Sequence, residues 1–192
     1  MFISKLRISG FKSFSEDTTI SINSGLNGII GPNGSGKSNI VEAIKWVMGE
    51  NSSKSLRGSG MNDLIFSGSA SKASKNIALV SLTLKVDKNI LKENYKKFIK
   101  DNIIEVERQT IRDSGSTYRI NGKEVKAKDI QYLFADFSSG SRSSNIIDQG
   151  TVGNLVLQKP IDRRKLLDEA AGISGISARK NETNNKLDST KK

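Results

Sequence analysis

The residues best suited to chemistry lie at positions 31–38, which read GPNGSGKS. This spacing fits G-x-x-x-x-G-K-S/T, with a short apolar run before it and an amphipathic segment after it. Glycines let successive backbone N–H groups point at one anion, Lys37 adds a mobile cation, and the Ser38 hydroxyl is placed to ligate Mg²⁺. The pattern predicts a nucleoside triphosphate site; the alternative is a glycine-rich turn that binds nothing. The predicted loop comprises Gly31, Pro32, Asn33, Gly34, Ser35, Gly36, Lys37 and Ser38.

Two residue types common in active sites are missing, because the chain contains no histidine and no cysteine. A disulfide framework, a thiolate metal site and a histidine general base are therefore excluded. Any reaction has to use carboxylates, amides, hydroxyls, Lys, Arg and a bound ion.

Such a loop has to be held between a strand and a helix. The apolar run Leu26–Ile30 is bounded by glycines and predicts a short buried strand. Asn39–Met48 carries apolar residues at helical spacing, which predicts an amphipathic helix packed on a sheet and ended by Gly49.

Alternating hydrophobicity and helical periodicity predict the remaining elements. Strands are expected at Phe2–Ile8, Thr18–Ile22 and Asn76–Val86, with a hairpin over Ile103–Gly122 that turns at Asp113-Ser114-Gly115. Helices are expected at Lys128–Phe137, from Pro160 onward, and in the charged insertion 87–102. The fold class is α/β.

Bulk composition limits the class of protein. A chain of 192 residues suggests one domain, or one domain with an appendage. The N-terminus MFISKLRISG lacks the apolar segment of a signal peptide, and no apolar run approaches the ~20 residues of a membrane span. We therefore expect a soluble cytoplasmic protein without a membrane partner. The net charge of +11 fits either a polyanion partner or a merely lysine-rich surface.

Four segments, in order along the chain, resemble the N-terminal half of the ABC-type ATPase head of Structural Maintenance of Chromosomes (SMC) proteins. They read LRISGFKSF, GPNGSGKSNIVEAIKWVMGE, KSLRGSGMNDLIFSGS and SSNIIDQGTVGNLVLQKPIDRRKLLDEAAGI. The resemblance is closest to the bacterial chromosome-condensing members. It implies residues 1–172 as the N-terminal part of the head and residues 173–192 as the start of a coiled coil. The implied fold has a mixed sheet around the phosphate loop and an antiparallel β-layer.

The resemblance also implies roles for residues outside the loop. Gln149 matches the glutamine that reaches Mg²⁺ and the attacking water, and Arg57 matches an arginine near the phosphates. Lys12 and Ser13 match positions near the ribose and phosphates, and Asp63 lies in a segment beside the adenine. The implied catalytic residues are Lys37, Arg57 and Gln149; the implied metal ligands are Ser38 and Gln149; the implied nucleotide contacts beyond the loop are Lys12, Ser13, Asn39, Asp63 and Gln149. The chain departs from the family pattern at Asp148 and Thr151.

A complete cassette also needs an apolar strand that ends in Asp-Glu. Tyr132–Asp136 has the apolar residues but is followed by Phe137, and Leu166–Glu169 follows Arg163-Arg164-Lys165, which indicates a surface helix. We reject both segments. In the SMC family the missing acids come from the C-terminal half of the head.

The resemblance thus implies a chain that binds ATP and Mg²⁺ but does not turn ATP over alone. Its implied partners are DNA, the C-terminal half of the same head, a second head and condensin-type accessory subunits, at the nucleoid. Two alternatives are a DNA-repair relative of the RecN or RecF type and a basic nucleic-acid-binding module with a vestigial loop. A small-molecule kinase is disfavoured, because no acceptor-site base or lid is visible.

Overall fold

The structure is a computed structural model that describes residues 2–51, 61–86, 98–136, 146–147, 160–171 and 174–190. It divides into two compact units, Met1–Ile130 and Gln131–Lys192. The first unit holds the sheet and the glycine loop, and the second holds the C-terminal helices.

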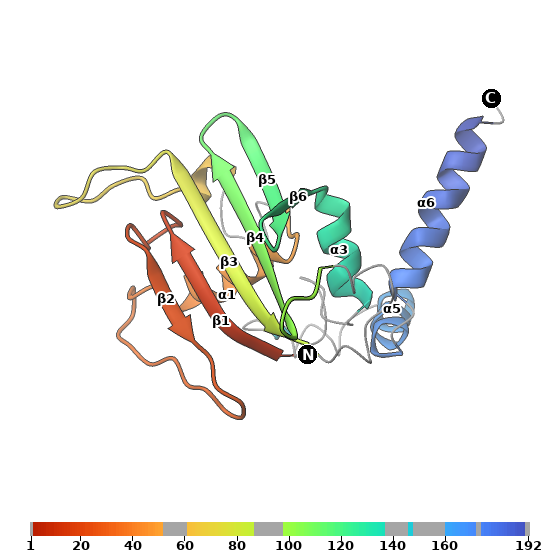
Figure 1. The fold of residues 1–192 in the computed structure, drawn as a ribbon, viewed down its shortest axis with the longest axis horizontal. Coiled ribbons are helices and arrows are strands. Elements are labelled where there is room, and N and C mark those ends of the chain that lie inside the picture. The colour runs from red at the N-terminus through yellow and green to blue at the C-terminus, as the bar shows by residue number, and fades with distance from the viewer. Residues whose placement is uncertain are drawn as a thin grey trace. The chain divides into compact units, whose positions relative to one another are not determined.

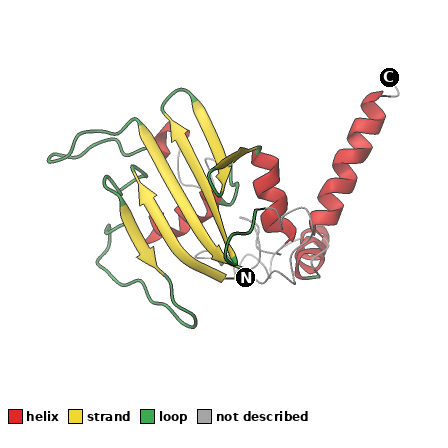
Figure 2. Ribbon diagram, in the orientation of Figure 1, coloured by secondary structure: helices red, strands yellow, loops and turns green. Residues whose placement is uncertain are grey.

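One antiparallel sheet of six strands dominates the first unit (Figure 1), with the order β2-β1-β3-β4-β5-β6. The strands are β1 (Phe2–Ser9), β2 (Thr18–Ser21), β3 (Ile77–Lys85), β4 (Ile103–Ile111), β5 (Gly115–Ile120) and β6 (Lys123–Val125). Figure 2 shows them as neighbouring yellow arrows. The α/β class and the predicted antiparallel β-layer are confirmed. The short strand β6 was not predicted, because three residues show no alternation.

The alternation of the strands gives the sheet an apolar inner face. In register across β1, β3 and β4, Leu6 pairs with Leu82, and Leu82 pairs with Val106. All three side chains are fully buried. Helix α1 (Lys37–Val47) packs against β3 and β4 on this side and buries Trp46 and Val47 completely. The sheet therefore supplies the platform on which the predicted helix after the glycine loop rests.

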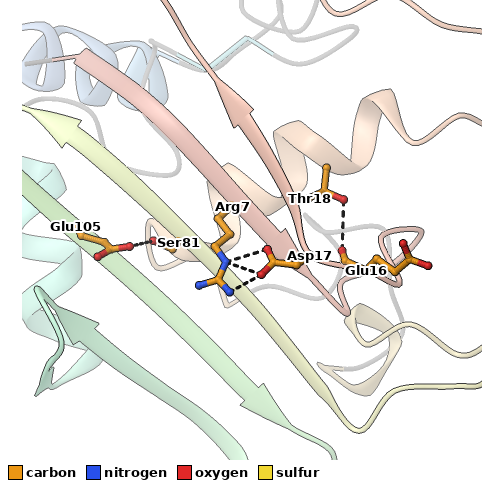
Figure 3. A network of polar contacts seen from close by, with 6 residues as sticks. All are labelled: Arg7, Glu16, Asp17, Thr18, Ser81 and Glu105. Carbon is orange, nitrogen blue, oxygen red and sulfur yellow. Dashed lines mark hydrogen bonds and ion pairs between the residues drawn. The ribbon is translucent and has the colours of Figure 1, made fainter.

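Polar side chains form a network of contacts on the outer face of the sheet, which Figure 3 shows from close by. The Arg7 Nε–H donates to the two carboxylate oxygens of Asp17 at 2.8 and 2.9 Å. The Ser81 hydroxyl donates to Glu105 Oε1 at 2.6 Å. Arg7 and Ser81 are cross-strand partners, so these contacts lie along one row of the outer face. Charged and hydroxyl side chains thus alternate with the inward apolar residues of the same strands.

The prediction of a buried strand at Leu26–Ile30 was wrong. These residues form no strand, and the exposed fractions of Leu26 and Ile30 are 104% and 97%. A strand needs a neighbour for its backbone hydrogen bonds and a face to cover its side chains. Among the described residues, none pairs with this segment. The apolar run immediately before the glycine loop is therefore exposed to solvent.

The remaining elements are short or helical. They are the 3₁₀ helix η2 (Met61–Leu64) and the helices α3 (Ala127–Asp136), α5 (Pro160–Ala170) and α6 (Ser174–Thr190). Asp136 therefore ends a helix rather than a strand, and α5 exposes Ile161 and Leu167. Both findings agree with the rejection of Asp136 and Glu169 as the acids of a buried strand. In the part of the chain that the structure describes, no helix is both long enough and apolar enough to cross a membrane.

Candidate functional site

The glycine loop leads directly into the N-terminus of α1. Gly34 and Gly36 have φ angles of +82° and +91°, a region that glycine reaches without steric strain. Gly36 is the N-cap, and within the described residues no side chain caps the first N–H groups of the helix. The first turn also contains no acidic residue. Uncapped N–H groups and the positive end of the helix dipole make this end of α1 suited to an anion.

Lys37 folds back over the loop that precedes it. Its ammonium donates to the backbone carbonyl oxygens of Gly31 at 2.7 Å and Pro32 at 2.6 Å. The Ser35 N–H also points to the Pro32 carbonyl, at 3.3 Å, which closes the loop into a tight turn. Carbonyl oxygens are neutral acceptors, and no described carboxylate pairs with Lys37. The loop therefore carries an uncompensated positive charge at its centre.

The turn after β1 brings two further predicted residues to α1. The Asn39 side-chain amide donates to the Ser13 hydroxyl at 2.8 Å. The Lys12 ammonium forms an ion pair with Glu42, a nearly buried residue of α1. Ser13 and Asn39 thus lie beside the loop, and their contact with a nucleotide stays a prediction. The side chain of Lys12 contacts a carboxylate of the helix.

Asp63, the predicted neighbour of the adenine, is exposed on η2. Two backbone hydrogen bonds tie this segment to the turn after β1: Lys12 N–H to Leu64 O, and Phe66 N–H to Gly10 O, each 2.8 Å. The structure therefore joins the segment that holds Asp63 to the turn that holds Lys12 and Ser13.

Two predicted catalytic residues lie outside the described residues. Arg57 falls within positions 52–60, and Gln149 falls within positions 148–159, together with Asp148 and Thr151. Their roles stay predictions.

Sequence reasoning missed Arg108, which caps the C-terminal end of α1. Its guanidinium donates to the carbonyl oxygens of Trp46 and Glu50 and to Asn51 Oδ1, each at 2.8 Å. It also lies 4.6 Å from the Trp46 ring and 4.7 Å from the Tyr118 ring. Burial lowers the pKa of Arg108 to about 10, so the group remains charged at neutral pH. The available signal was its place in the inward register of β4, two residues after Val106.

The donor set fits a magnesium-bound polyphosphate. The Lys37 ammonium and the first N–H groups of α1 lie at the loop, and such groups donate to phosphate oxygens. Mg²⁺ in phosphate sites takes few protein ligands and relies on phosphate and water oxygens. The described residues include no group of three or more acidic side chains that could hold a metal ion. Ser38 is exposed in the first turn, where its hydroxyl is accessible to a metal ion.

Comparison with known proteins decides the family. Residues 2–141 match the RecF/RecN/SMC N-terminal domain. The chain belongs to this family. Over 190 residues it is 44% identical to the chromosome partition protein Smc of Cereibacter sphaeroides, an alignment that covers 99% of this chain and 16% of that protein. The resemblance to bacterial SMC proteins is confirmed, and the chain spans about a sixth of the length of such relatives.

Solved SMC heads share the fold of this SMC-family chain. A chain from a study of ATP-driven dimerisation and DNA-stimulated activation of SMC ATPases matches with a TM-score of 0.76 and 29% identity, over 88% of this chain and 99% of that one. The Smc head of Pyrococcus furiosus, bound to the C-terminal domain of ScpA, matches with a TM-score of 0.78 and 30% identity, over 99% of this chain and 46% of that one.

Proposed function

We propose that this chain is the ATP-binding N-terminal part of an SMC-type ATPase head that serves chromosome condensation and segregation. The observation that carries the proposal is the uncapped N-terminus of α1 with Lys37 folded over the glycine loop and no described carboxylate to neutralise it. The family assignment supports it, as does the fold shared with a chain studied for ATP-driven dimerisation. ATP and Mg²⁺ are the proposed ligands.

Each residue of the loop has a separate task in this proposal. Lys37 exchanges the carbonyl oxygens of Gly31 and Pro32 for phosphate oxygens, and the first N–H groups of α1 donate to the same phosphates. Ser38 and Gln149 hold the metal ion, and Arg57 stabilises charge on the transferred phosphoryl group. When bound, Mg²⁺ neutralises phosphate charge and orients the phosphates. Ser13 and Asn39 form the rim of the site, and Asp63 lies on the segment proposed to flank the adenine.

Hydrolysis is proposed to need the C-terminal half of the head. The two acidic segments weighed from the sequence lie in helices, and neither supplies the acidic strand of a complete cassette. Leu26, Ile29 and Ile30 are exposed just ahead of the loop. A strand from the second half would cover these side chains and pair with their backbone. In this scheme residues 1–172 belong to the head, and residues 173–192, which include the whole of α6, begin a coiled coil.

The further partners follow the same proposal. A second head is proposed to complete the site across the nucleotide, a proposal supported by the similarity to a chain from a study of ATP-driven dimerisation of SMC ATPases. The charge of +11 suits DNA, and the ScpA-bound Smc head of Pyrococcus furiosus suggests an accessory subunit of that kind. The proposed location is the cytoplasm, at the nucleoid.

The experiment mixes this chain with the C-terminal head segment of the Cereibacter sphaeroides relative and measures phosphate release from Mg-ATP. Neither segment alone should release phosphate above background, and the mixture should do so in a Lys37-dependent way. Steady Lys37-dependent release by this chain alone would contradict the half-site proposal and return attention to Asp136 and Glu169. Lys5→Ala is the matched control, because it removes one exposed lysine from the outer side of β1.

A further inference from the structure

The turn that follows β1 is built tightly against α1. Gly10 has a φ of +63°, and a Cβ at this position would lie 2.1 Å from the Ile77 carbonyl oxygen. Phe11 is fully buried, and its ring centroid lies 5.3 Å from that of Trp46 on α1. The Phe14 N–H then donates to the Phe11 carbonyl at 2.8 Å, which closes the turn. The backbone of residues 10–14 therefore forms a compact turn.

Two side chains of α1 hold this turn from the same face of the helix. Asn39 and Glu42 are three residues apart, so they are neighbours on the helix surface. Asn39 donates to the Ser13 hydroxyl, and Glu42 pairs with the Lys12 ammonium. The side chains of Lys12 and Glu42 are 13% and 6% exposed, so water and salt screen this pair only weakly. Removal of either partner would take away this nearly buried ion pair.

The held turn forms one wall of the loop. A Cβ at Gly36, the N-cap of α1, would lie 2.6 Å from the Ser13 hydroxyl and 3.7 Å from the Phe14 ring. Ser13 is thus placed directly against the residue that precedes Lys37. Because Asn39 donates to the Ser13 oxygen, the hydroxyl hydrogen of Ser13 is available to a further acceptor.

We propose that Glu42 is a positioning residue of the nucleotide site, which acts through Lys12. By binding the Lys12 ammonium, Glu42 keeps the turn and its Ser13 hydroxyl against the N-terminus of α1. It also balances the charge of Lys12, whose side chain is largely shielded from solvent. The proposal rests on the proposed function, since it assigns Glu42 to the same ATP site.

The test is a double-mutant cycle read as the dissociation constant for Mg-ATP. Glu42→Gln and Lys12→Met should each raise the dissociation constant about tenfold. The dissociation constant of the double variant should not exceed the larger of the two single-variant values, because the two groups act as one unit. Asn39→Ala, which removes the second contact to the turn, should weaken binding in the same direction.

Val47→Ala is the control for a purely structural effect. Val47 is fully buried in the same helix, at the end away from the loop, so its truncation lowers stability without touching the turn. The proposal predicts a lowered unfolding midpoint and an unchanged dissociation constant for this variant. An equal loss of affinity in Val47→Ala, or strictly additive losses in the cycle, would overturn the role of Glu42. Unchanged affinity in Glu42→Gln would overturn it while leaving the ATP site standing, whereas no Mg-ATP binding by the wild-type chain would remove both proposals.

Discussion

The Arg108 guanidinium donates a 2.8 Å hydrogen bond to the backbone carbonyl of Trp46, 62 residues earlier in the chain. This bond fastens the last turn of α1 to strand β4. The last carbonyl groups of a helix have no partner within the helix, and a buried cation is a favourable partner for them. Arg108 therefore fixes the far end of the helix whose N-terminus carries the glycine loop.

Replacement of Arg108 should strongly destabilise the first unit. Arg108→Ala removes the buried hydrogen bonds from the guanidinium to the carbonyl oxygens of Trp46 and Glu50, so we expect a loss of about 3 kcal/mol in the free energy of unfolding. The free energy of unfolding of Arg108→Lys should lie between those of the wild type and Arg108→Ala, because lysine keeps the positive charge but lacks the planar guanidinium group. Urea unfolding followed by circular dichroism and by the fluorescence of Trp46, the single tryptophan, gives the measurement.

Arg119→Ala is the control for Arg108. Arg119 pairs with Glu107 on the outer face, where its side chain is 32% exposed, so its loss should change the free energy of unfolding by less than about 1 kcal/mol. An equal loss in the free energy of unfolding for Arg108→Ala and Arg119→Ala would show that the burial of Arg108 does not increase its contribution to stability.

The two loop glycines should differ in their tolerance of alanine. Both have positive φ, so a Cβ costs about 1–2 kcal/mol of backbone strain at either position. At Gly34 the Cβ meets no atom within 4 Å, but at Gly36 it lies 2.6 Å from the Ser13 hydroxyl. Gly36→Ala should therefore lower both stability and Mg-ATP affinity more than Gly34→Ala. Equal unfolding midpoints and affinities in the two variants would argue against the close approach of Ser13.

The sequence predicted those parts of the fold that depend on neighbouring residues. Alternation located the strands of the sheet, and helical spacing located α1, because each pattern reflects one buried face. The same reasoning failed at Leu26–Ile30, where an apolar run between glycines has the composition of a buried strand but meets no partner among the described strands. A strand is completed by another segment, and one sequence does not say which segment that is.

Some residues of the candidate site could be predicted from the sequence and others could not. The loop and its lysine follow from the eight-residue spacing, since the chemistry requires those types in that order. Contacts between distant positions, such as Lys12 with Glu42 or Arg108 with Trp46, depend on how the turn, the helix and the sheet meet in space. An inward Arg108 between inward Val106 and Thr110 was the only local hint of its buried role.

Acid should weaken the outer face of the sheet through Asp17. The hydrogen bonds from Arg7 lower the pKa of the Asp17 carboxyl below its ordinary value of 3.8. The unfolded chain therefore takes up this proton first as pH falls, so the contribution of Asp17 to stability is complete above about pH 4 and is lost below it. The pair is exposed, so the contribution should stay below about 1 kcal/mol. Asp17→Asn should flatten the stability curve between pH 5 and pH 2 by about this amount; an unchanged slope would contradict the assignment.

The exposed side chains of Leu26 and Ile30 provide a test of the proposed contact with a C-terminal head segment. Substitution of both by Ser should change the stability of this chain by less than about 0.5 kcal/mol, because neither side chain is buried. The same substitutions should reduce the phosphate release of the mixture with a C-terminal head segment, since they remove the apolar surface proposed to receive it. Full activity of the mixture with both serines would exclude this surface as the contact.

The central claim is that Lys37 and the N-terminus of α1 hold the phosphates of Mg-ATP. Its most direct test is calorimetric titration of Mg-ATP into the wild-type chain, Lys37→Ala and Lys5→Ala at one salt concentration. We expect saturable binding to the wild type and to Lys5→Ala, and a loss of affinity of about a hundredfold or more in Lys37→Ala, because a charge-assisted contact is lost. Equal affinity of the wild type and Lys37→Ala would contradict it, and would favour a basic nucleic-acid-binding module whose glycine loop is vestigial.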